Sequence, residues 1–169
     1  MLKSFVKSFE MKITLLCVGK TVQDFVEDGI KLYSERLSHY CRFSLKCIPN
    51  IKGASLTQQQ IKQKEGELIL KELEKTEPYI ILLDEKGKCY DSVEWSCHLE
   101  KLFNSVNQQK ELFFIVGGAY GFSQEVYNKA KEKLSLSAMT FSHQMVRLIF
   151  VEQLYRAFTI MKGEPYHHK

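Results

Sequence analysis

The stretch Leu112-Phe113-Phe114-Ile115-Val116-Gly117-Gly118-Ala119-Tyr120-Gly121-Phe122-Ser123 decides the fold class of this chain. Its first five residues are a dense apolar run, which is typical of a strand buried on both faces of a sheet. The glycines end that strand, and Ser123 is a suitable N-cap for a helix. A strand, a glycine turn and a helix in this order indicate an open α/β sheet, in which small molecules bind at the carboxyl ends of the strands.

Three more strands are expected before this stretch, because short apolar runs recur along the chain. They are Lys12–Val18, Phe43–Ile48 and Tyr79–Leu83. After the first of them, apolar residues at helical spacing predict an amphipathic helix across Val22–Tyr40. Strands that alternate with helices and are apolar on both faces favour a mostly parallel sheet flanked by helices. The predicted fold class is therefore α/β.

Two further helices carry start signals. Ser55 or Thr57 is placed to cap a helix that ends before Pro78. Asp91 and Glu94 have the spacing of a capping box, which begins a helix across the following apolar positions. The chain thus alternates strand and helix up to the stretch that opens this section, as a three-layer α/β domain requires.

Length and composition limit the class of protein. The 169 residues suit one domain, predicted to span 11–169, and no apolar run reaches the roughly 18 residues that a membrane span needs. Residues Met1–Glu10 lack the features of a signal peptide and read as an extension before the second methionine. Five cysteines without a CxxC pair argue against a disulfide framework and against structural zinc. A cytoplasmic location is therefore expected.

The glycine turn and a second loop are the candidate ligand site. The turn is neither a P-loop nor a GxGxxG motif, so a merely structural tight turn remains equally consistent with Gly117–Gly121. The loop Leu134–Ser142 alternates small residues with apolar ones and is suited to hold an adenine edge by main-chain hydrogen bonds. A short edge strand followed by an N-cap at Ser142 explains the same loop equally well.

The last helix and the tail suggest a partner. From His143 to Lys162 the helix is apolar on most sides, which favours packing on the sheet and on a second subunit in a homodimer. Glu152 and Arg156 have the favourable order for an i,i+4 ion pair. The tail from Gly163 is consistent with a fraying end or chance metal binding, or with contacts to an RNA substrate.

Four segments in order make the chain resemble the bacterial ribosomal RNA large subunit methyltransferase H family. They are VGGAYG at Val116–Gly121, LSLSAMTFSHQ at Leu134–Gln144, EQLYRA at Glu152–Ala157 and GEPYHH at Gly163–His168. The start of the first strand and the triplet Lys64-Glu65-Gly66 are also similar to that family. The family often has proline where this chain has Ser142, a mild departure within the cofactor loop.

The resemblance implies a homodimeric, S-adenosylmethionine-dependent enzyme of the SPOUT superfamily with a C-terminal trefoil knot. It implies methylation of N3 of a pseudouridine in large-subunit (23S) ribosomal RNA on the assembled ribosome, with no membrane partner. Carried over position by position, the cofactor contacts fall at Leu83, Gly117, Leu136, Ser137, Ala138, Met139, Thr140 and Phe141.

The chemistry suggests roles for the remaining residues. Pseudouridine N3 carries a proton that must leave, so a general base or a donor that polarises the imide is expected. We assign that role to His167 or Tyr166, with Arg147 and Arg156 holding a phosphate or a uracil carbonyl. His143 is a further predicted RNA contact, and no metal ion is needed.

Other functions stay open on the sequence alone. A SPOUT methyltransferase that acts on transfer RNA and a ribosome-associated module without catalysis both fit the motifs. A nucleotide-binding stress protein is disfavoured because the phosphate loops are missing. The net charge of +4 permits an RNA partner without requiring one, and a dimer would double it.

Overall fold

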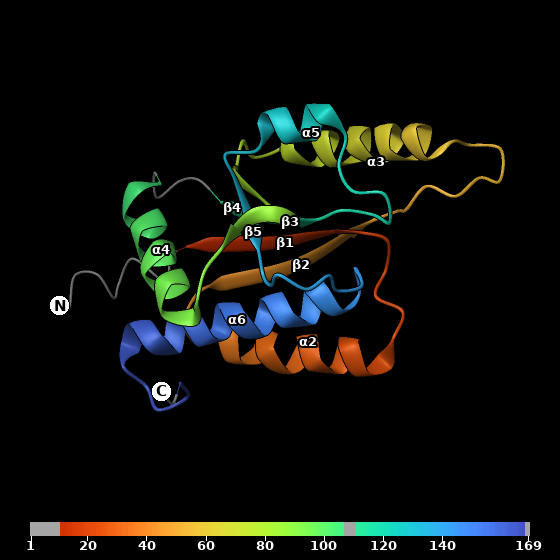
Figure 1. Ribbon diagram of the computed structural model, residues 1–169. Helices are drawn as coiled ribbons and strands as arrows, with labels where there is room; N and C mark the ends of the chain where they lie inside the picture. The colour runs from red at the N-terminus through yellow and green to blue at the C-terminus, as the bar shows by residue number, and fades with distance from the viewer. Residues whose placement is uncertain (1–10, 107–110, 168–169) are drawn as a thin grey trace.

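The computed structural model describes residues 11–106 and 111–167 and contains a parallel five-stranded sheet in the order β2-β1-β4-β3-β5 (Figure 1). The strands are β1 (Lys12–Val18), β2 (Arg42–Ile48), β3 (Tyr79–Cys89), β4 (Leu112–Val116) and β5 (Glu132–Ser135). The helices are α2 (Asp24–Leu37), α3 (Gln58–Leu73), α4 (Ser92–Ser105), α5 (Gln124–Lys129) and α6 (Met145–Lys162). The predicted α/β class is confirmed, and the predicted extension Met1–Glu10 lies outside the described residues.

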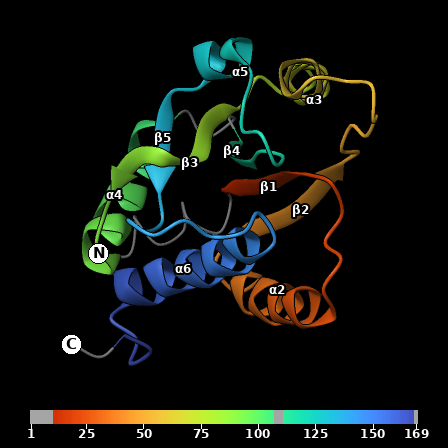
Figure 2. The same cartoon turned by 45° about the vertical axis from the view of Figure 1, so that its right-hand side comes forward.

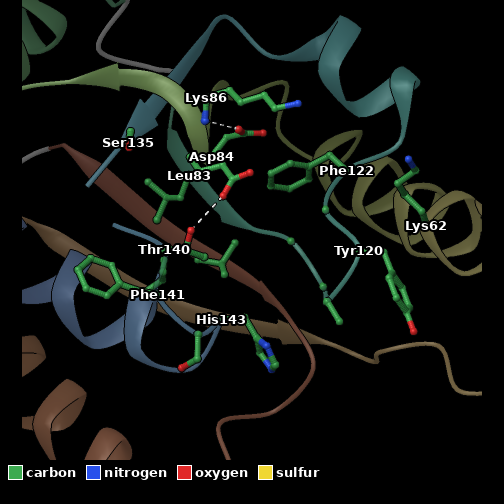
Figure 3. Close-up of a pocket in the computed structure, with 18 of the residues that line it drawn as sticks. Lys62, Leu83, Asp84, Lys86, Tyr120, Phe122, Ser135, Thr140, Phe141 and His143 are labelled. Atoms are coloured by element: carbon green, nitrogen blue, oxygen red, sulfur yellow. Dashed lines mark hydrogen bonds between the residues drawn. The ribbon is translucent and has the colours of Figure 1, made fainter. Parts of the chain in front are cut away.

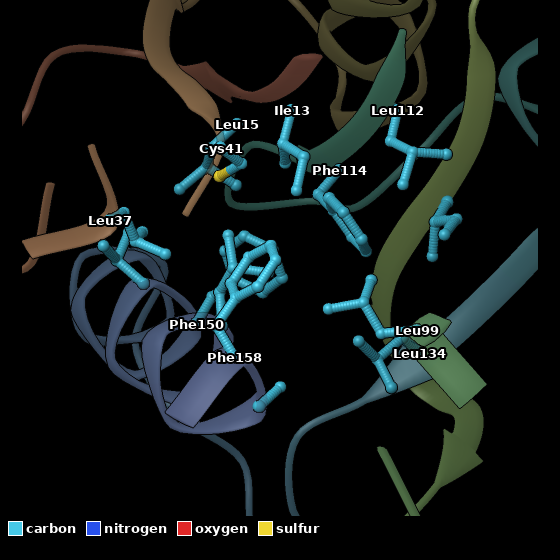
Figure 4. Packing of buried hydrophobic residues seen from close by; sticks show 14 of the residues in the cluster. Ile13, Leu15, Leu37, Cys41, Leu99, Leu112, Phe114, Leu134, Phe150 and Phe158 are labelled. Atoms are coloured by element: carbon cyan, nitrogen blue, oxygen red, sulfur yellow. The ribbon is translucent and has the colours of Figure 1, made fainter. Parts of the chain in front are cut away.

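Helices cover both faces of the sheet (Figures 1 and 2). Helices α2, α4 and α6 pack on one face, and α3 and α5 pack on the other. Successive strand residues alternate between the two cores, so Leu15 and Phe114 face α6 while Leu16 and Phe113 face α3. On the α6 side the rings of Phe114 and Phe150 lie 4.6 Å apart, near the centre of the larger core (Figure 4). Burial on both faces explains why the central strands β1 and β4 are apolar on both faces.

The helix starts follow the capping residues of the sequence. Thr57 caps α3, and its side chain and that of Gln60 each accept the other's main-chain N–H as a capping box. Asp91 and Glu94 form the predicted capping box of α4. The Ser123 hydroxyl accepts from the N–H of Val126 at the start of α5. Each cap satisfies N–H groups that have no partner within the helix itself.

The third strand and the second loop differ from the predicted boundaries. Strand β3 continues past its predicted end at Leu83 as far as Cys89. It pairs with a fifth strand, β5, and the pairing shifts its register after Leu83. Leu134 and Ser135, which were predicted within the loop, end that strand. The edge-strand alternative is therefore confirmed for these residues, and the loop begins after them. Strand β5 has little signature in the sequence, because a four-residue edge strand has hardly any periodicity.

Helix α6 is covered on two sides within its own chain. It lies between α2 and α4, and Gly29 of α2 allows close approach, since a Cβ there would lie 2.6 Å from a methyl carbon of Leu148. These neighbours account for part of the broad apolar surface of α6, and the homodimer stays a prediction. The helix ends at Gly163, whose φ of 67° is left-handed and reverses the chain. Within the described residues, no helix has both the length and the apolar character to cross a membrane.

Candidate active site

A cleft of about 1060 Å³ opens at the carboxyl ends of β3, β4 and β5 (Figure 3). Its walls come from strand ends, the glycine turn, the second loop and the first turn of α3, and α6 begins at its mouth. The lining includes residues 57–59, 83–86, 116–122, 134–137 and 139–143. Parallel strands place such clefts where their loops diverge, so the position agrees with the predicted ligand site.

The glycine turn forms one wall of this cleft. Gly118 and Gly121 pair in an isolated antiparallel bridge, and the Gly121 N–H donates to the Gly118 carbonyl at 3.1 Å. Gly121 has a φ of 79°, which side chains other than glycine's rarely tolerate. A Cβ at Gly117 would lie 3.2 Å from the ring of Phe122. The turn therefore brings bare main chain to the cleft surface, and at Gly117 it leaves little room for a side chain.

The second loop forms the opposite wall and is tied by its own small side chains. The Ser135 hydroxyl donates to the carbonyl of Ser137 at 2.9 Å, and the Ser137 hydroxyl accepts from the N–H of Met139 at 2.9 Å. Among the described residues, no group accepts from the N–H of Thr140 or Phe141. Both residues line the cleft, so these N–H groups are candidates for hydrogen bonds to a ligand.

Most of the predicted cofactor residues meet in this cleft. The cleft is lined by Leu83 in β3, by Gly117 after β4, and by the loop residues Leu136, Ser137, Met139, Thr140 and Phe141, whereas Ala138 does not line it. His143 also lines the cleft, and its contact with RNA stays a prediction. Partial desolvation and the charge of Arg147 lower the pKa of His143, so this imidazole is neutral at pH 7.

The site residues predicted from the sequence do not include several charged and aromatic groups at the cleft. Asp84 directly follows Leu83 in β3, and its carboxylate accepts a hydrogen bond from the hydroxyl of Tyr127. Burial, with the hydrogen bond to Asp84, raises the pKa of Tyr127 to about 12. Lys62 projects from α3, and the exposed ring of Tyr120 stands at the rim (Figure 3). In the sequence, Asp84 directly follows the predicted strand Tyr79–Leu83, and this position could have indicated a site residue. Tyr127 carries no such signal, because only the tertiary fold brings it next to Asp84.

The predicted tail residue Tyr166 lies elsewhere, against the middle of α6. Glu152 Oε1 accepts from Arg156 Nη2 at 2.6 Å and from the Tyr166 hydroxyl at 3.0 Å. The Tyr33 hydroxyl lies 3.1 Å from that of Tyr166, and Arg156 stands over the Tyr166 ring. We call Tyr33, Glu152, Arg156 and Tyr166 the C-terminal cluster. Its ion pair has the predicted i,i+4 order.

The C-terminal cluster holds the end of the chain in place. Burial, together with hydrogen bonds to Tyr33 and Glu152, raises the pKa of Tyr166 above its usual range, so its phenol is protonated at neutral pH. His167 follows it, and the Nδ1 atom of this imidazole is buried without a hydrogen-bond partner in the described part of the chain. An unpaired buried nitrogen is costly, which makes it a candidate for contact with a further group.

Arg147 has surroundings different from those predicted. Its side chain is 0% exposed, and Nη2 donates to the Val18 carbonyl at 2.9 Å. Nη1 donates to the Gly19 carbonyl at 3.0 Å and to the Thr21 hydroxyl, and Nε donates to the carbonyl of His143. A guanidinium so enclosed has no face left for a phosphate. Arg147 instead fixes the loop after β1 against the start of α6, beside the mouth of the cleft.

The cleft and the C-terminal cluster are separate within one chain. Among the cleft-lining residues, Val146 is the last along α6, and a rise of 1.5 Å per residue puts Arg156 about 15 Å further along the helix axis. Tyr166, His167, Arg147 and Arg156 do not line the cleft. The structure thus brings the predicted cofactor residues together but does not bring the predicted catalytic residues to them.

Sequence comparison identifies the family. A family model described as a predicted SPOUT methyltransferase matches residues 11–167. The ribosomal RNA large subunit methyltransferase H of Parabacteroides distasonis is 53% identical over 160 residues, which cover 94% of this chain and 100% of that protein. The protein of the same name from Christiangramia forsetii is 52% identical over the same shares. This chain belongs to the ribosomal RNA large subunit methyltransferase H family.

A distant solved structure has the same fold. A probable methyltransferase from Bordetella pertussis Tohama I superposes with a TM-score of 0.56 at 9% identity, covering 93% of this chain and 99% of that one. In this SPOUT methyltransferase the small-residue loop and the glycine turn, both named from the sequence, form the two walls of the cleft. The trefoil knot stays a prediction from the family resemblance.

Proposed function

We propose that this methyltransferase transfers the methyl group of S-adenosylmethionine to N3 of a pseudouridine in large-subunit ribosomal RNA on the assembled ribosome. The observation that carries the proposal is the cleft at the carboxyl edge of the sheet, lined by nearly all of the predicted cofactor residues. The names of the relatives, which are ribosomal RNA large subunit methyltransferases, supply the class of substrate. The cytoplasm, where ribosomes work, is the proposed location.

The cleft is suited to the cofactor in size and in chemistry. A volume of about 1060 Å³ admits a nucleoside with an amino-acid side arm. Leu83, Leu136 and Phe141 offer apolar surface to an adenine ring, and the N–H groups of Thr140 and Phe141 are available to its edge or to the ribose. The bare main chain at Gly117 allows close approach. Recognition in this proposal therefore comes mainly from shape and main-chain hydrogen bonds.

When bound, the cofactor supplies an activated methyl group on a sulfonium. Pseudouridine N3 forms the new N–C bond as the S–C bond breaks, its electron pair stays on sulfur, and the N3 proton must be accepted by a base. His167 is the proposed acceptor, and Tyr166, which keeps its proton, is the proposed donor to a uracil carbonyl. Arg156 is the proposed contact for a phosphate. Arg147 acts by positioning the start of α6, with His143, at the mouth of the cleft.

Because the C-terminal cluster is remote from the cleft of its own chain, we propose that a homodimer completes the site. The tail of one subunit would then stand over the cleft of the other. Exposed apolar side chains before and at the start of α2 and in the cleft loop support such an interface: Val22 is 74% exposed, Phe25 60% and Met139 75%. Solvent-exposed apolar groups gathered in this way are typical of surfaces that bind another protein.

Calorimetric titration with S-adenosylmethionine, with the mass in solution measured in parallel, tests the proposal first. We expect saturable binding of one cofactor per subunit by a dimer. Methyl transfer is then assayed with assembled ribosomes, free ribosomal RNA and transfer RNA, and only the ribosomes should be methylated efficiently. Preferred methylation of transfer RNA would contradict the substrate, and a well-folded dimer that binds no cofactor and transfers no methyl group to ribosomes would contradict the reaction.

A further inference from the structure

Glu65 is a buried carboxylic acid that the proposed reaction leaves without a role. It lies on α3 and is only 3% exposed. Its Oε1 accepts from the N–H of Ile51 at 3.0 Å, in the segment after β2. Its Oε2 is buried without a hydrogen-bond partner among the described residues. Buried carboxyl oxygens are seldom left unpaired, so this one needs an explanation.

The unpaired oxygen is directed at the back of the glycine turn. A Cβ added to Gly118 would overlap Glu65 Oε2 and would lie 3.0 Å from the carboxyl carbon. Gly118 itself lines the cleft, so a single residue of main chain separates the carboxyl group from the proposed cofactor site. The next residue, Gly66, packs just as closely on Ser123, which caps α5. The triplet Lys64-Glu65-Gly66 therefore serves to seat α3 tightly behind the turn.

No positive charge of the described protein balances this carboxyl group. In the described ranges, no lysine, arginine or histidine forms an ion pair with Glu65. Burial raises the pKa of Glu65, against a smaller opposing effect of the Ile51 hydrogen bond. A buried carboxylate without a counter-charge is unfavourable, and a cation placed nearby would relieve that cost.

The two forms of the proposed cofactor differ in charge. S-Adenosylmethionine carries a sulfonium, an ammonium and a carboxylate, and so has a net positive charge. After methyl transfer the sulfur is a neutral thioether, and S-adenosylhomocysteine has no net charge. A positive cofactor beside Glu65 stabilises the ionised form of this carboxyl group, whereas the neutral product does not. The carboxyl group therefore favours the cofactor over the product, and the protein interior screens that effect less than water does.

We propose that Glu65 is a positioning and specificity residue that acts through the glycine turn, favouring the sulfonium cofactor over its neutral thioether product. The inference rests on the proposed function and deepens it, since it names the group that helps the spent cofactor leave. It also gives a reason for glycine at position 118, because any larger residue would push the carboxyl group away from the cleft.

The test compares the dissociation constants of S-adenosylmethionine and S-adenosylhomocysteine for the full-length wild-type protein and for Glu65→Gln. The amide keeps the shape of the side chain and its acceptor for the Ile51 N–H, but removes the charge. We expect the affinity for S-adenosylmethionine to fall about tenfold while that for S-adenosylhomocysteine changes less than about twofold. Glu67→Gln, an exposed change of equal charge on the same helix, should alter neither constant.

The ratio of the two constants is measured within each variant, so a loss of folded protein does not change it. Glu65→Asp, which keeps the charge on a shorter side chain, should retain more of the preference for the sulfonium than Glu65→Gln. Equal weakening of both ligands, or an unchanged ratio, would overturn the inference and leave Glu65 a packing residue. Wild-type protein that binds neither ligand would instead contradict the proposed function, and the inference with it.

Discussion

The cleft and the C-terminal cluster are built from different kinds of groups. The cleft presents main chain, small side chains and apolar surface, as at Gly117 and Thr140. The C-terminal cluster consists of ionisable side chains that satisfy one another, with Glu152 Oε1 accepting from both Arg156 and Tyr166. Shape and main-chain hydrogen bonds suit the binding of a ligand, whereas ionisable groups suit the movement of a proton. Substitutions in the two regions should therefore change different quantities.

The largest difference between the effect on turnover and the effect on cofactor binding is expected for a substitution at His167. His167→Ala should lower turnover about 100-fold by removing the proposed base, while the dissociation constant of S-adenosylmethionine changes less than about twofold. Single-turnover methylation of ribosomes and calorimetry measure the two quantities. His39→Ala, which removes an exposed histidine after α2, is the matched control and should change neither. If His167→Ala and Tyr166→Phe both turned over at the wild-type rate, neither residue would take part in the reaction.

A substitution in the glycine turn should instead weaken cofactor binding and leave turnover unchanged. Gly117→Val places a branched side chain where a Cβ alone would already lie 3.2 Å from Phe122. We expect cofactor affinity to fall about tenfold or more, with turnover restored at saturating cofactor. Gly53→Ala, in the loop before α3 and away from the cleft lining, should bind normally. Normal binding by Gly117→Val would show that the cofactor does not approach this main chain.

A matched pair of tyrosines sharpens the comparison. Tyr127 donates to Asp84 at the cleft, and Tyr166 donates to Glu152 in the C-terminal cluster. Each Phe variant loses one hydrogen bond to a carboxylate, worth about fivefold in the quantity that its region controls. Tyr127→Phe should weaken cofactor binding at unchanged turnover, and Tyr166→Phe should lower turnover at unchanged binding. If both variants changed the same quantity, binding or turnover, the cleft and the C-terminal cluster would not have separate roles.

The smallest effect concerns stability at high pH. Burial and Asp84 raise the pKa of Tyr127 to about 12, and burial, Tyr33 and Glu152 raise that of Tyr166. An unfolded tyrosine ionises near pH 10, so between about pH 10 and 12 unfolding releases protons that the folded chain retains. The free energy of unfolding should therefore fall as pH rises, by at most about 1.4 kcal/mol per pH unit for each phenol.

Chemical denaturation at several pH values between 9 and 11.5 measures this slope. Tyr127→Phe and Tyr166→Phe should each make it shallower, because each removes a phenol whose proton the fold retains. Tyr120→Phe is the control, since its ring is exposed at the rim of the cleft. A slope that neither buried variant changes would mean that these phenols ionise alike in the folded and unfolded chains.

Most of the fold could be predicted because it depends on local patterns. The apolar runs at Lys12–Val18 and Leu112–Val116 became β1 and β4, and the capping residues Asp91 and Ser123 begin α4 and α5. The fifth strand was left open, since its pairing with the second part of β3 depends on a register shift after Leu83. Such a shift is a property of the assembled sheet and has no local signature.

The candidate site was predictable in part. The loop residues from Leu136 to Phe141, except Ala138, line one cleft together with Leu83 of β3, and their contact with the cofactor stays a prediction. Arg147 was predicted to hold a phosphate or a uracil carbonyl, but its guanidinium is buried against carbonyl groups, and a lone arginine on an apolar helix looks the same in the sequence in either case. Glu65 drew attention only through the family resemblance, since a glutamate among lysines on a helix usually faces solvent.

The sequence by itself determined four of the five strands, the caps of α3, α4 and α5, and the two loops that line the cleft, because periodicity, caps and glycine act over a few residues. Only the tertiary structure decided the partners of the ionisable groups. Arg147 donates hydrogen bonds to carbonyl groups at the end of β1, and the Tyr166 hydroxyl lies against Glu152 and Tyr33. Glu65 lies behind Gly118. These contacts join residues far apart along the chain, and burial makes each of them strong enough to set a charge, a pKa and a role.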